Sequence, residues 1–182
     1  VTPHFDYGTI TCDGPSQTFT ITVNPTAQVN DPDDRVVCNG ATVPAVNFST
    51  NRIGGSTSYS WINDNPGIGL PDHGDENIAP FTVTNSTTAP VVATITVTPH
   101  FTNGFVKCDG APESFTITVN PTTQVIDPSD IVVCNGSPVA SVVFSTNNTI
   151  GVTTYSWTNN TTGINLASSG TGNLPTFNAV NN

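Results

Sequence analysis

The chain has 182 residues, enough for one large or two small domains, and only 9% of them are charged. Its formal net charge is −10, and its only Lys or Arg residues are Arg35, Arg52 and Lys107, so we expect no binding to nucleic acid or to anionic lipid. No apolar run reaches the roughly 20 residues of a membrane helix, so we expect no membrane insertion. The many Thr, Ser and Asn residues favour strands and turns.

The sequence repeats itself at an offset of 96 residues. VTPHF at Val1 returns at Val97, and FTITVNPT at Phe19 returns at Phe115. Of the 86 residue pairs that this offset brings together, 46 are identical, with no insertion or deletion. The period is the size of one immunoglobulin-like sandwich domain, so the predicted fold class is all-β, with tandem immunoglobulin-like β-sandwich domains.

Two strand-breaking segments, NPTAQVNDPDD and NPTTQVIDPSD, mark domain junctions near Pro25 and Pro121. They divide the chain into three parts. We expect residues 1–24 to be the last strands of a preceding repeat, 25–120 to be a complete sandwich, and 121–182 to be an incomplete one without its last strands.

Within the complete sandwich, alternation of apolar and polar residues predicts the strands. In chain order they are centred on residues 36–37, 46–48, 59–61, 81–83, 91–97 and 115–119. In the longest strand, Thr94, Thr96 and Thr98 point away from the apolar face. No segment has helical periodicity of useful length.

Two tryptophans, Trp61 and Trp157, occupy the repeated Y-S-W strand, with Tyr59 and Tyr155 on the same faces. We interpret all four aromatic side chains as core residues of a sandwich. In the alternative interpretation, the indoles are sugar-stacking platforms of a carbohydrate-binding module. An exposed tryptophan would favour that alternative.

The motifs VVCNG, AVNFSTN, TSYSWIND with PGIGL, APVVATITVTPHF, CDG and FTITVNP follow one another in this order. With this combination the chain resembles, over essentially its whole length, the PKD-like, immunoglobulin-like repeats of very large surface proteins of Bacteroidota. Those repeats occur in adhesins and gliding-associated proteins exported by the type IX pathway. The resemblance implies a cell-surface, adhesive or filamentous role and brings no catalytic residues. The alternative function is an accessory carbohydrate-binding module of a secreted enzyme.

Four cysteines, Cys12, Cys38, Cys108 and Cys134, occur without a CxxC motif or a nearby His pair, so disulfides fit better than a zinc site. Disulfides in an acidic, Thr-rich chain indicate an extracellular location. Within one domain we expect Cys38 to bond to Cys108, with Cys12 and Cys134 bonded to neighbouring domains. The alternative pairs Cys12 with Cys38 and Cys108 with Cys134, across the junctions.

The histidines give no sign of catalysis. His4 and His100 share one repeat position, and His73 lies in an unrelated polar loop. There is no G-x-S-x-G motif, and we expect no Asp to orient either repeated histidine. The sequence therefore predicts no catalytic residue and no enzyme.

The acidic cluster of Asp31, Asp33 and Asp34 has the oxygen ligands that Ca²⁺ requires, but its copy is weaker. A second cluster, DHGDEN, loses every acid in its copy. We interpret both as solvated turns and expect no cofactor, with Ca²⁺ at the first cluster as the weaker alternative.

The chain is rich in N-x-S/T sequons, which are candidate glycosylation sites. They lie at Asn47, Asn85, Asn135, Asn147, Asn159 and Asn160. Glycan is therefore an expected surface modification.

The incomplete sandwich is expected to need a partner. Residues 121–182 hold core residues but lack the long strand and its return, so alone they would expose an apolar face and an unpaired sheet edge. Residues 1–24 hold complementary strands, and only the equivalent of TTAPVVATIT is missing between the two parts. We expect copies to join head to tail into a filament, by β-augmentation or within one longer polypeptide.

Overall fold

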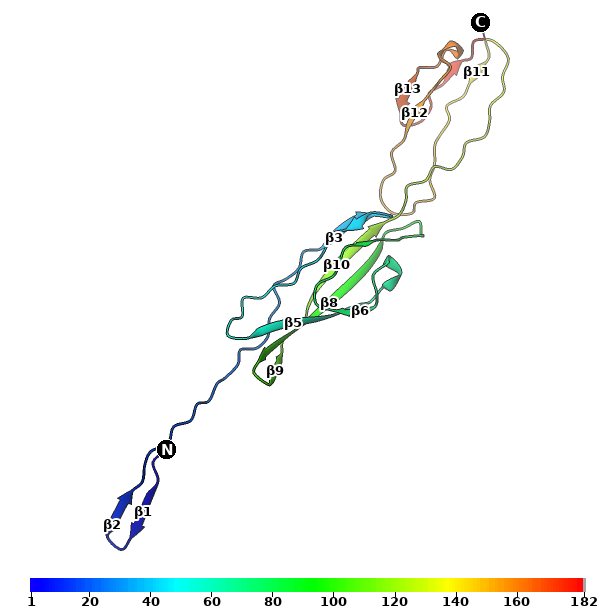
Figure 1. Ribbon diagram of the computed structural model, residues 1–182. Coiled ribbons are helices and arrows are strands. Elements are labelled where there is room, and N and C mark those ends of the chain that lie inside the picture. The colour runs from blue at the N-terminus through cyan, green and yellow to red at the C-terminus, as the bar shows by residue number, and fades with distance from the viewer. Residues whose placement is uncertain (182) are drawn as a thin grey trace.

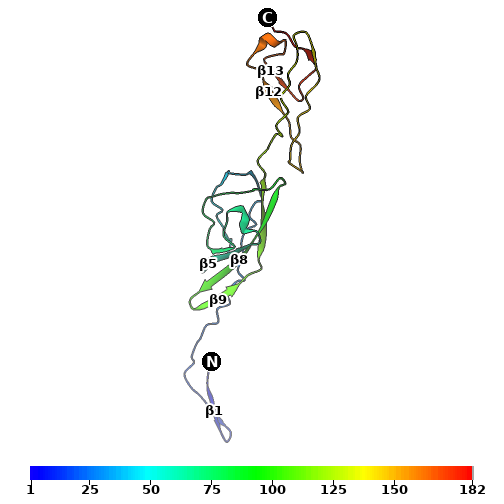
Figure 2. The same ribbon diagram turned by 90° about the vertical axis from the view of Figure 1, so that its right-hand side faces the viewer.

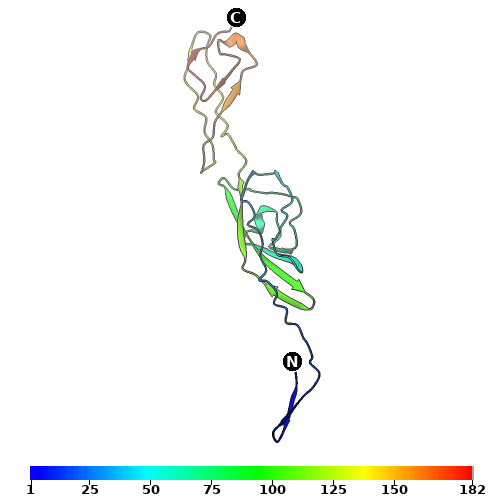
Figure 3. The same ribbon diagram turned by 90° about the vertical axis from the view of Figure 1, so that its left-hand side faces the viewer.

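The computed structural model describes residues 1–181 and is an extended row of three parts (Figure 1). Residues 25–120 form the central unit. A hairpin near the N-terminus lies beyond one of its ends, and residues 121–181 lie beyond the other, which the turned views also show (Figure 2, Figure 3). The fold is all-β, as the sequence predicts.

The described helices are two short 3-10 turns, η1 (Pro66–Ile68) and η2 (Thr162–Ile164). Each is followed by a residue in the left-handed region, Gly69 in the first copy and Asn165 in the second, which ends the turn. Neither turn has the length and apolar character of a membrane span.

One layer of the central unit is a sheet in the order β3–β10–β8–β5–β6, with β9 paired to the last part of β8. Its strands are β3 (Arg35–Cys38), β5 (Ser56–Asn63), β6 (His73–Asp75), β8 (Val91–Asn103), β9 (Val106–Asp109) and β10 (Glu113–Asn120). Strand β10 is parallel to β3 on one side and antiparallel to β8 on the other. Its backbone is therefore paired on both sides over residues 117–119.

The opposite layer is less regular. Strand β4 (Thr42–Val43) pairs with β7 (Phe81–Thr82). The strand predicted around residues 46–48 is reduced to one bridge, Val46 with Ile78, because the Phe48 N–H donates to the side-chain Oδ1 of Asn77 at 2.8 Å and not to a strand. The two layers nevertheless enclose one core, an arrangement consistent with a β-sandwich.

The core takes apolar side chains from both layers. The sheet contributes Ala93, Ile95, Val97, Phe115, Ile117 and Val119, and the opposite layer contributes Val43, Val46, Ile78 and Val83. Tyr59 and Trp61 lie in the same core and are 7% and 6% exposed. The Trp61 indole lies against Gly74 of β6 and leaves no room for a side chain there.

The N-terminal part has one hairpin, β1 (His4–Tyr7) with β2 (Ile10–Asp13), which repeats the end of β8 with β9. Residues 14–34 contain no strand. The N-terminal part therefore contains a formed hairpin, and the strand predicted at residues 19–23 has no partner.

The C-terminal part repeats only some of the central strands. It contains β11 (Pro138–Val139), β12 (Ser156–Thr158), β13 (Ser169–Thr171) and β14 (Phe177–Asn178). Strand β11 pairs with β14 and β12 with β13, which repeats the pairs β4–β7 and β5–β6. Residues 121–181 contain no counterpart of β3, β8 or β10.

The buried indole predicts a large stability effect. We expect Trp61→Ala to unfold the central unit, because loss of a buried Trp costs about 3–5 kcal/mol and total stabilities are about 5–15 kcal/mol. The control is Ile62→Ala on the same strand, at a side chain that is 61% exposed. Its effect should stay within about 0.5 kcal/mol in urea denaturation. Equal midpoints for the two variants would contradict the assignment.

Candidate assembly site

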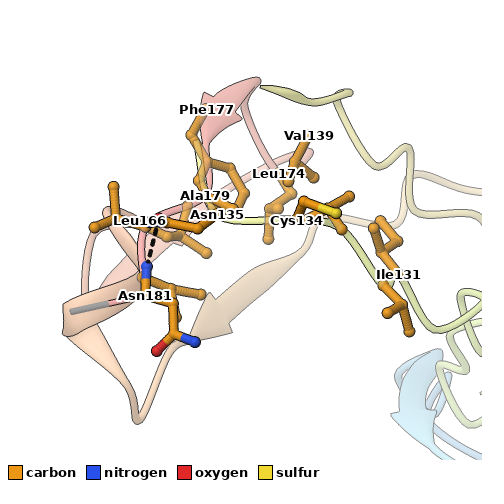
Figure 4. Close-up of a pocket in the computed structure, with 13 residues that line it drawn as sticks. Ile131, Cys134, Asn135, Val139, Leu166, Leu174, Phe177, Ala179 and Asn181 are labelled. Carbon is orange, nitrogen blue, oxygen red and sulfur yellow. Dashed lines mark hydrogen bonds between the residues drawn. The ribbon is translucent and has the colours of Figure 1, made fainter. Parts of the chain in front are cut away.

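A groove lies in the C-terminal part where the central unit has its core (Figure 4). The cavity measures about 530 Å³ and is lined mainly by apolar side chains. Prominent among them are Ile131, Val139, Ile164, Leu166, Leu174 and Phe177. The counterparts of four of them, 96 residues earlier, are Val43, Ile68, Leu70 and Ile78, and each is at most 3% exposed. The groove is therefore an uncovered core.

The cover in the central unit is β10 with β8. Ile117 and Val119 of β10 are fully buried in the core, and β10 lies along β3. In the C-terminal part the counterpart of β3, residues 131–134, is not a strand, and Val133 is 42% exposed, whereas its counterpart Val37 packs against the core. An open edge and an open apolar face thus occur together.

An aromatic cluster in the C-terminal part lacks the ring that β10 supplies in the central unit. In the central unit the Phe48 ring lies 5.5 Å from Tyr59 and 6.5 Å from Phe115 of β10. In the C-terminal part Phe144 lies 5.6 Å from Tyr155, which repeats the first contact. Residues 121–181 provide no counterpart of the third ring.

A buried asparagine fastens β10 in the central unit. The Asn85 N–H donates to Asn39 Oδ1 at 2.7 Å, and Asn85 Nδ2 donates to the carbonyl oxygen of Val119 at 2.7 Å. In the second copy the Asn181 N–H donates to Asn135 Oδ1 at 3.0 Å, the bond drawn in Figure 4. The backbone of Asn181 is thus held at the groove in the same way.

The segment that matches β10 is present elsewhere in the chain. Residues 19–26, FTITVNPT, are identical to residues 115–122. Phe19, Ile21 and Val23 are 71%, 79% and 87% exposed. Their counterparts in β10 are at most 1% exposed. The chain therefore carries a second copy of its own core strand without a core around it.

The hairpin β1–β2 already has the contacts of its counterpart. Gly14 N donates to the Pro3 oxygen at 2.9 Å, as Gly110 N does to the Pro99 oxygen. His4 Nδ1 lies 2.5 Å from Asp13 Oδ1, and the equivalent His100–Asp109 distance is 2.6 Å. The N-terminal part therefore presents a formed hairpin and an unpaired segment, residues 19–24.

The expectation that no Asp orients a repeated histidine is wrong. Asp109 faces His100 across the β8–β9 hairpin, and Ser60 Oγ lies 2.9 Å from His100 Nε2. The hydrogen bond from His100 holds the pKa of Asp109 below its ordinary value. The CDG motif after the turn was the signal in the sequence, because hairpin register places its Asp opposite the histidine.

This Ser–His–Asp arrangement lacks the oxyanion-binding N–H groups that acyl transfer also requires. Ser60 lies in the middle of β5, which is paired with β8 on one side and β6 on the other. Its neighbouring N–H groups are engaged in the sheet and are not free to stabilise an oxyanion. The arrangement fastens three strands together.

The four cysteines are unpaired in the structure, and the expected Cys38–Cys108 bond does not fit it. Cys38 lies opposite Asn120, next to the Val119–Val91 pair, whereas Cys108 lies opposite Phe101. Ten residues of β8 separate these positions, about 33 Å of strand. A disulfide needs Cα atoms within about 7 Å. In Figure 1, β2 with Cys12 and β9 with Cys108 lie toward the N-terminal end of the row, whereas β3 with Cys38 lies at the opposite end of the central unit, toward the C-terminal part that holds Cys134.

One sequon is not a glycosylation site in the folded chain. Asn85 is 4% exposed, and its side chain is bonded to Val119, Ala89 and Thr87. Asn135 and Asn159 are also engaged in hydrogen bonds through their side chains. The exposed sequon positions without such a role are Asn47 and Asn147, and Asn160 is exposed as well.

One carboxylate of the acidic cluster of Asp31, Asp33 and Asp34 is part of the hydrogen bonding of the fold. Asp34 Oδ1 accepts a hydrogen bond from the Thr116 N–H at 2.6 Å, while Asp31 and Asp33 are exposed. Within residues 1–181 no group of three or more His, Cys, Asp or Glu residues is arranged to hold a metal ion.

The tryptophans give no platform for sugar in the central unit, because Trp61 is buried. Trp157 is half-buried and lies against Gly170 as Trp61 lies against Gly74.

Comparison with known proteins adds no assignment, since neither a family model nor a curated protein sequence matches the chain.

The role of Asn85 gives a prediction. We expect Asn85→Ala to lower the free energy of unfolding by about 1–3 kcal/mol, because the carbonyl of Val119 then loses a buried partner. Asn47→Ala, at an exposed sequon, is the matched control and should be neutral in the same urea titration. If both variants unfold at the wild-type midpoint, Asn85 does not fasten β10.

Proposed function

We propose that the chain is a structural and adhesive segment of an extracellular bacterial surface filament, built head to tail from immunoglobulin-like units, and not an enzyme. One observation carries the proposal. The chain has a groove that lacks β10 and, in its N-terminal part, an exposed segment, residues 19–24, that is identical to residues 115–120 of β10. The occupant of the groove is a second copy of this chain, through its residues 1–24.

The central unit supplies the register of this contact. Ile117 faces Arg35 and Asn120 faces Cys38 in the parallel β10–β3 ladder. By the offset of 96, residues 21–24 of the second copy run parallel to residues 131–134. Val23 then offers its carbonyl oxygen to the Asn181 side chain.

Two further contacts follow from the same offset. Phe19 of the second copy supplies the third ring beside Phe144 and Tyr155. The hairpin of the second copy lies along β12, where His4 meets Ser156 as His100 meets Ser60 in the central unit. Strand, ring and hairpin together supply the part of the core that β10 and the end of β8 supply in the central unit.

The gain from apolar burial in this contact is of the same order as the cost of association. Burial of a large apolar side chain is worth about 1.5–3 kcal/mol, so Phe19, Ile21 and Val23 together contribute about 5–9 kcal/mol. Association costs about 4–15 kcal/mol of lost freedom. Backbone pairing adds to the gain, and we expect assembly that depends on concentration.

The geometry of the contact favours a filament. The groove and the exposed strand lie at opposite ends of an extended chain (Figure 1). A contact between two different surfaces does not close on itself at this geometry and propagates. The acidic, Thr-rich composition and the four cysteines support an extracellular location. The buried Trp61 makes a carbohydrate-binding module the weaker alternative.

Sedimentation velocity of the 182-residue chain tests the proposal. We expect a concentration-dependent series of species, and filaments by electron microscopy. Ile21→Asp should abolish the series, because it places a charge in the groove. It should leave the central unit folded, because Ile21 is 79% exposed in the single chain.

Thr22→Asp is the matched control, since it adds the same charge to the other face of the strand and should preserve assembly. A synthetic peptide of residues 19–26 should compete for the groove and inhibit assembly. A monomer at every concentration would overturn the proposal, and so would equal loss of assembly in both Asp variants.

A further inference from the structure

The cysteines occupy two repeated positions at opposite ends of a unit. Cys38 is the last residue of β3, the first strand of the central unit, and Cys134 is its counterpart, whereas Cys12 and Cys108 lie in the hairpin strands β2 and β9. A single chain offers no bond between them, as their separation shows. Cysteines at these two positions come near each other only between neighbouring units of a row.

The two cysteine positions come near each other at the linker between units. The linker is residues 24–27 before the central unit and their counterparts, residues 120–123, after it. Asn103 Nδ2 donates to Asn24 Oδ1 at 2.8 Å, and the carbonyl of Ala27 lies so close to Gly110 that a side chain there has no room. The hairpin that carries Cys108 therefore packs on the linker that precedes its own unit.

The central unit also contacts the linker that follows it, at residues 120–122. In the central unit Cys38 lies opposite Asn120, and Asn39 Nδ2 donates to Thr122 Oγ1 at 2.8 Å. Asn120 is the counterpart of Asn24. Asn24 contacts the hairpin of the unit after it, and its counterpart Asn120 lies opposite the first-strand cysteine of the unit before it, so each linker is flanked by both cysteine positions.

We infer that neighbouring copies are cross-linked by two disulfides, which rests on the head-to-tail contact proposed above. Cys38 of one copy bonds to Cys12 of the next, and Cys134 of the first bonds to Cys108 of the next. This single rule uses all four cysteines and leaves none paired within a chain. The bonds make a reversible contact permanent.

The oxidant is a low-molecular-weight disulfide such as oxidised glutathione. One cysteine thiolate attacks it and forms a mixed disulfide, releasing one glutathione. The thiolate of the second cysteine then attacks the protein sulfur and releases the second glutathione. Two protein thiols lose two electrons and two protons, and one oxidised glutathione becomes two reduced glutathiones.

The test oxidises a 1:1 mixture of ¹⁴N-labelled and ¹⁵N-labelled chains with oxidised glutathione under assembling conditions. Proteolysis without reduction and mass spectrometry should give Cys12–Cys38 and Cys108–Cys134 peptides, about half of which join a light to a heavy partner. Links within one isotope only, a Cys38–Cys108 link, or free thiols in assembled protein would each overturn the inference.

Variants separate this inference from the assembly that it rests on. Cys38→Ser should leave Cys12 as a free thiol and keep the Cys108–Cys134 link. With dithiothreitol present, the wild type should still assemble in sedimentation velocity. Assembly without links would overturn the cross-links and leave the proposed function standing, whereas no assembly in either condition would overturn both.

Discussion

The burial of β10 between β3 and β8 is the contact on which the rest of the structure depends. Phe115, Ile117 and Val119 reach the core from this strand, and all three are at most 1% exposed. Their burial is worth about 5–9 kcal/mol, as much as the whole stability of many domains. A unit with this strand has a closed core, and a unit without it has a groove.

This constraint explains why the two ends of the chain differ from its middle. The C-terminal part keeps the strand pairs β11–β14 and β12–β13 and the Phe144–Tyr155 contact, so its half of the core is preformed. The N-terminal part keeps the hairpin and leaves residues 19–24 unpaired. A preformed half-core and a preformed hairpin lose little conformational freedom when they meet, which favours binding.

The sequence predicts the fold well where a local pattern decides it. Alternation places Ala93, Ile95 and Val97 on the core face of β8, because strand side chains alternate with a period of two. The Y-S-W strand and its buried Trp61 follow from the same rule. The 96-residue repeat predicts that the C-terminal part lacks β8 and β10, but not that residues 131–134, the counterpart of β3, form no strand.

The sequence fails where partners distant in the chain decide. The Phe48 N–H donates a hydrogen bond to the Asn77 side chain. Asp109 forms a hydrogen bond with His100 only because the hairpin register places the two residues opposite each other. Cys38 and Cys108 share a domain, but strand direction sends them to opposite ends. Asn85 reads as a sequon, yet its side chain holds β10. None of these relations has a periodic signal.

The pairing of residues 21–24 with residues 131–134 is the central claim, and hydrogen–deuterium exchange tests it most directly. The reduced 182-residue chain is measured above and below its assembly concentration. The account predicts slow exchange of the amides of both segments in the assembled protein and fast exchange on dilution, with residues 115–120 protected in both. Fast exchange of residues 21–24 in assembled protein would contradict it.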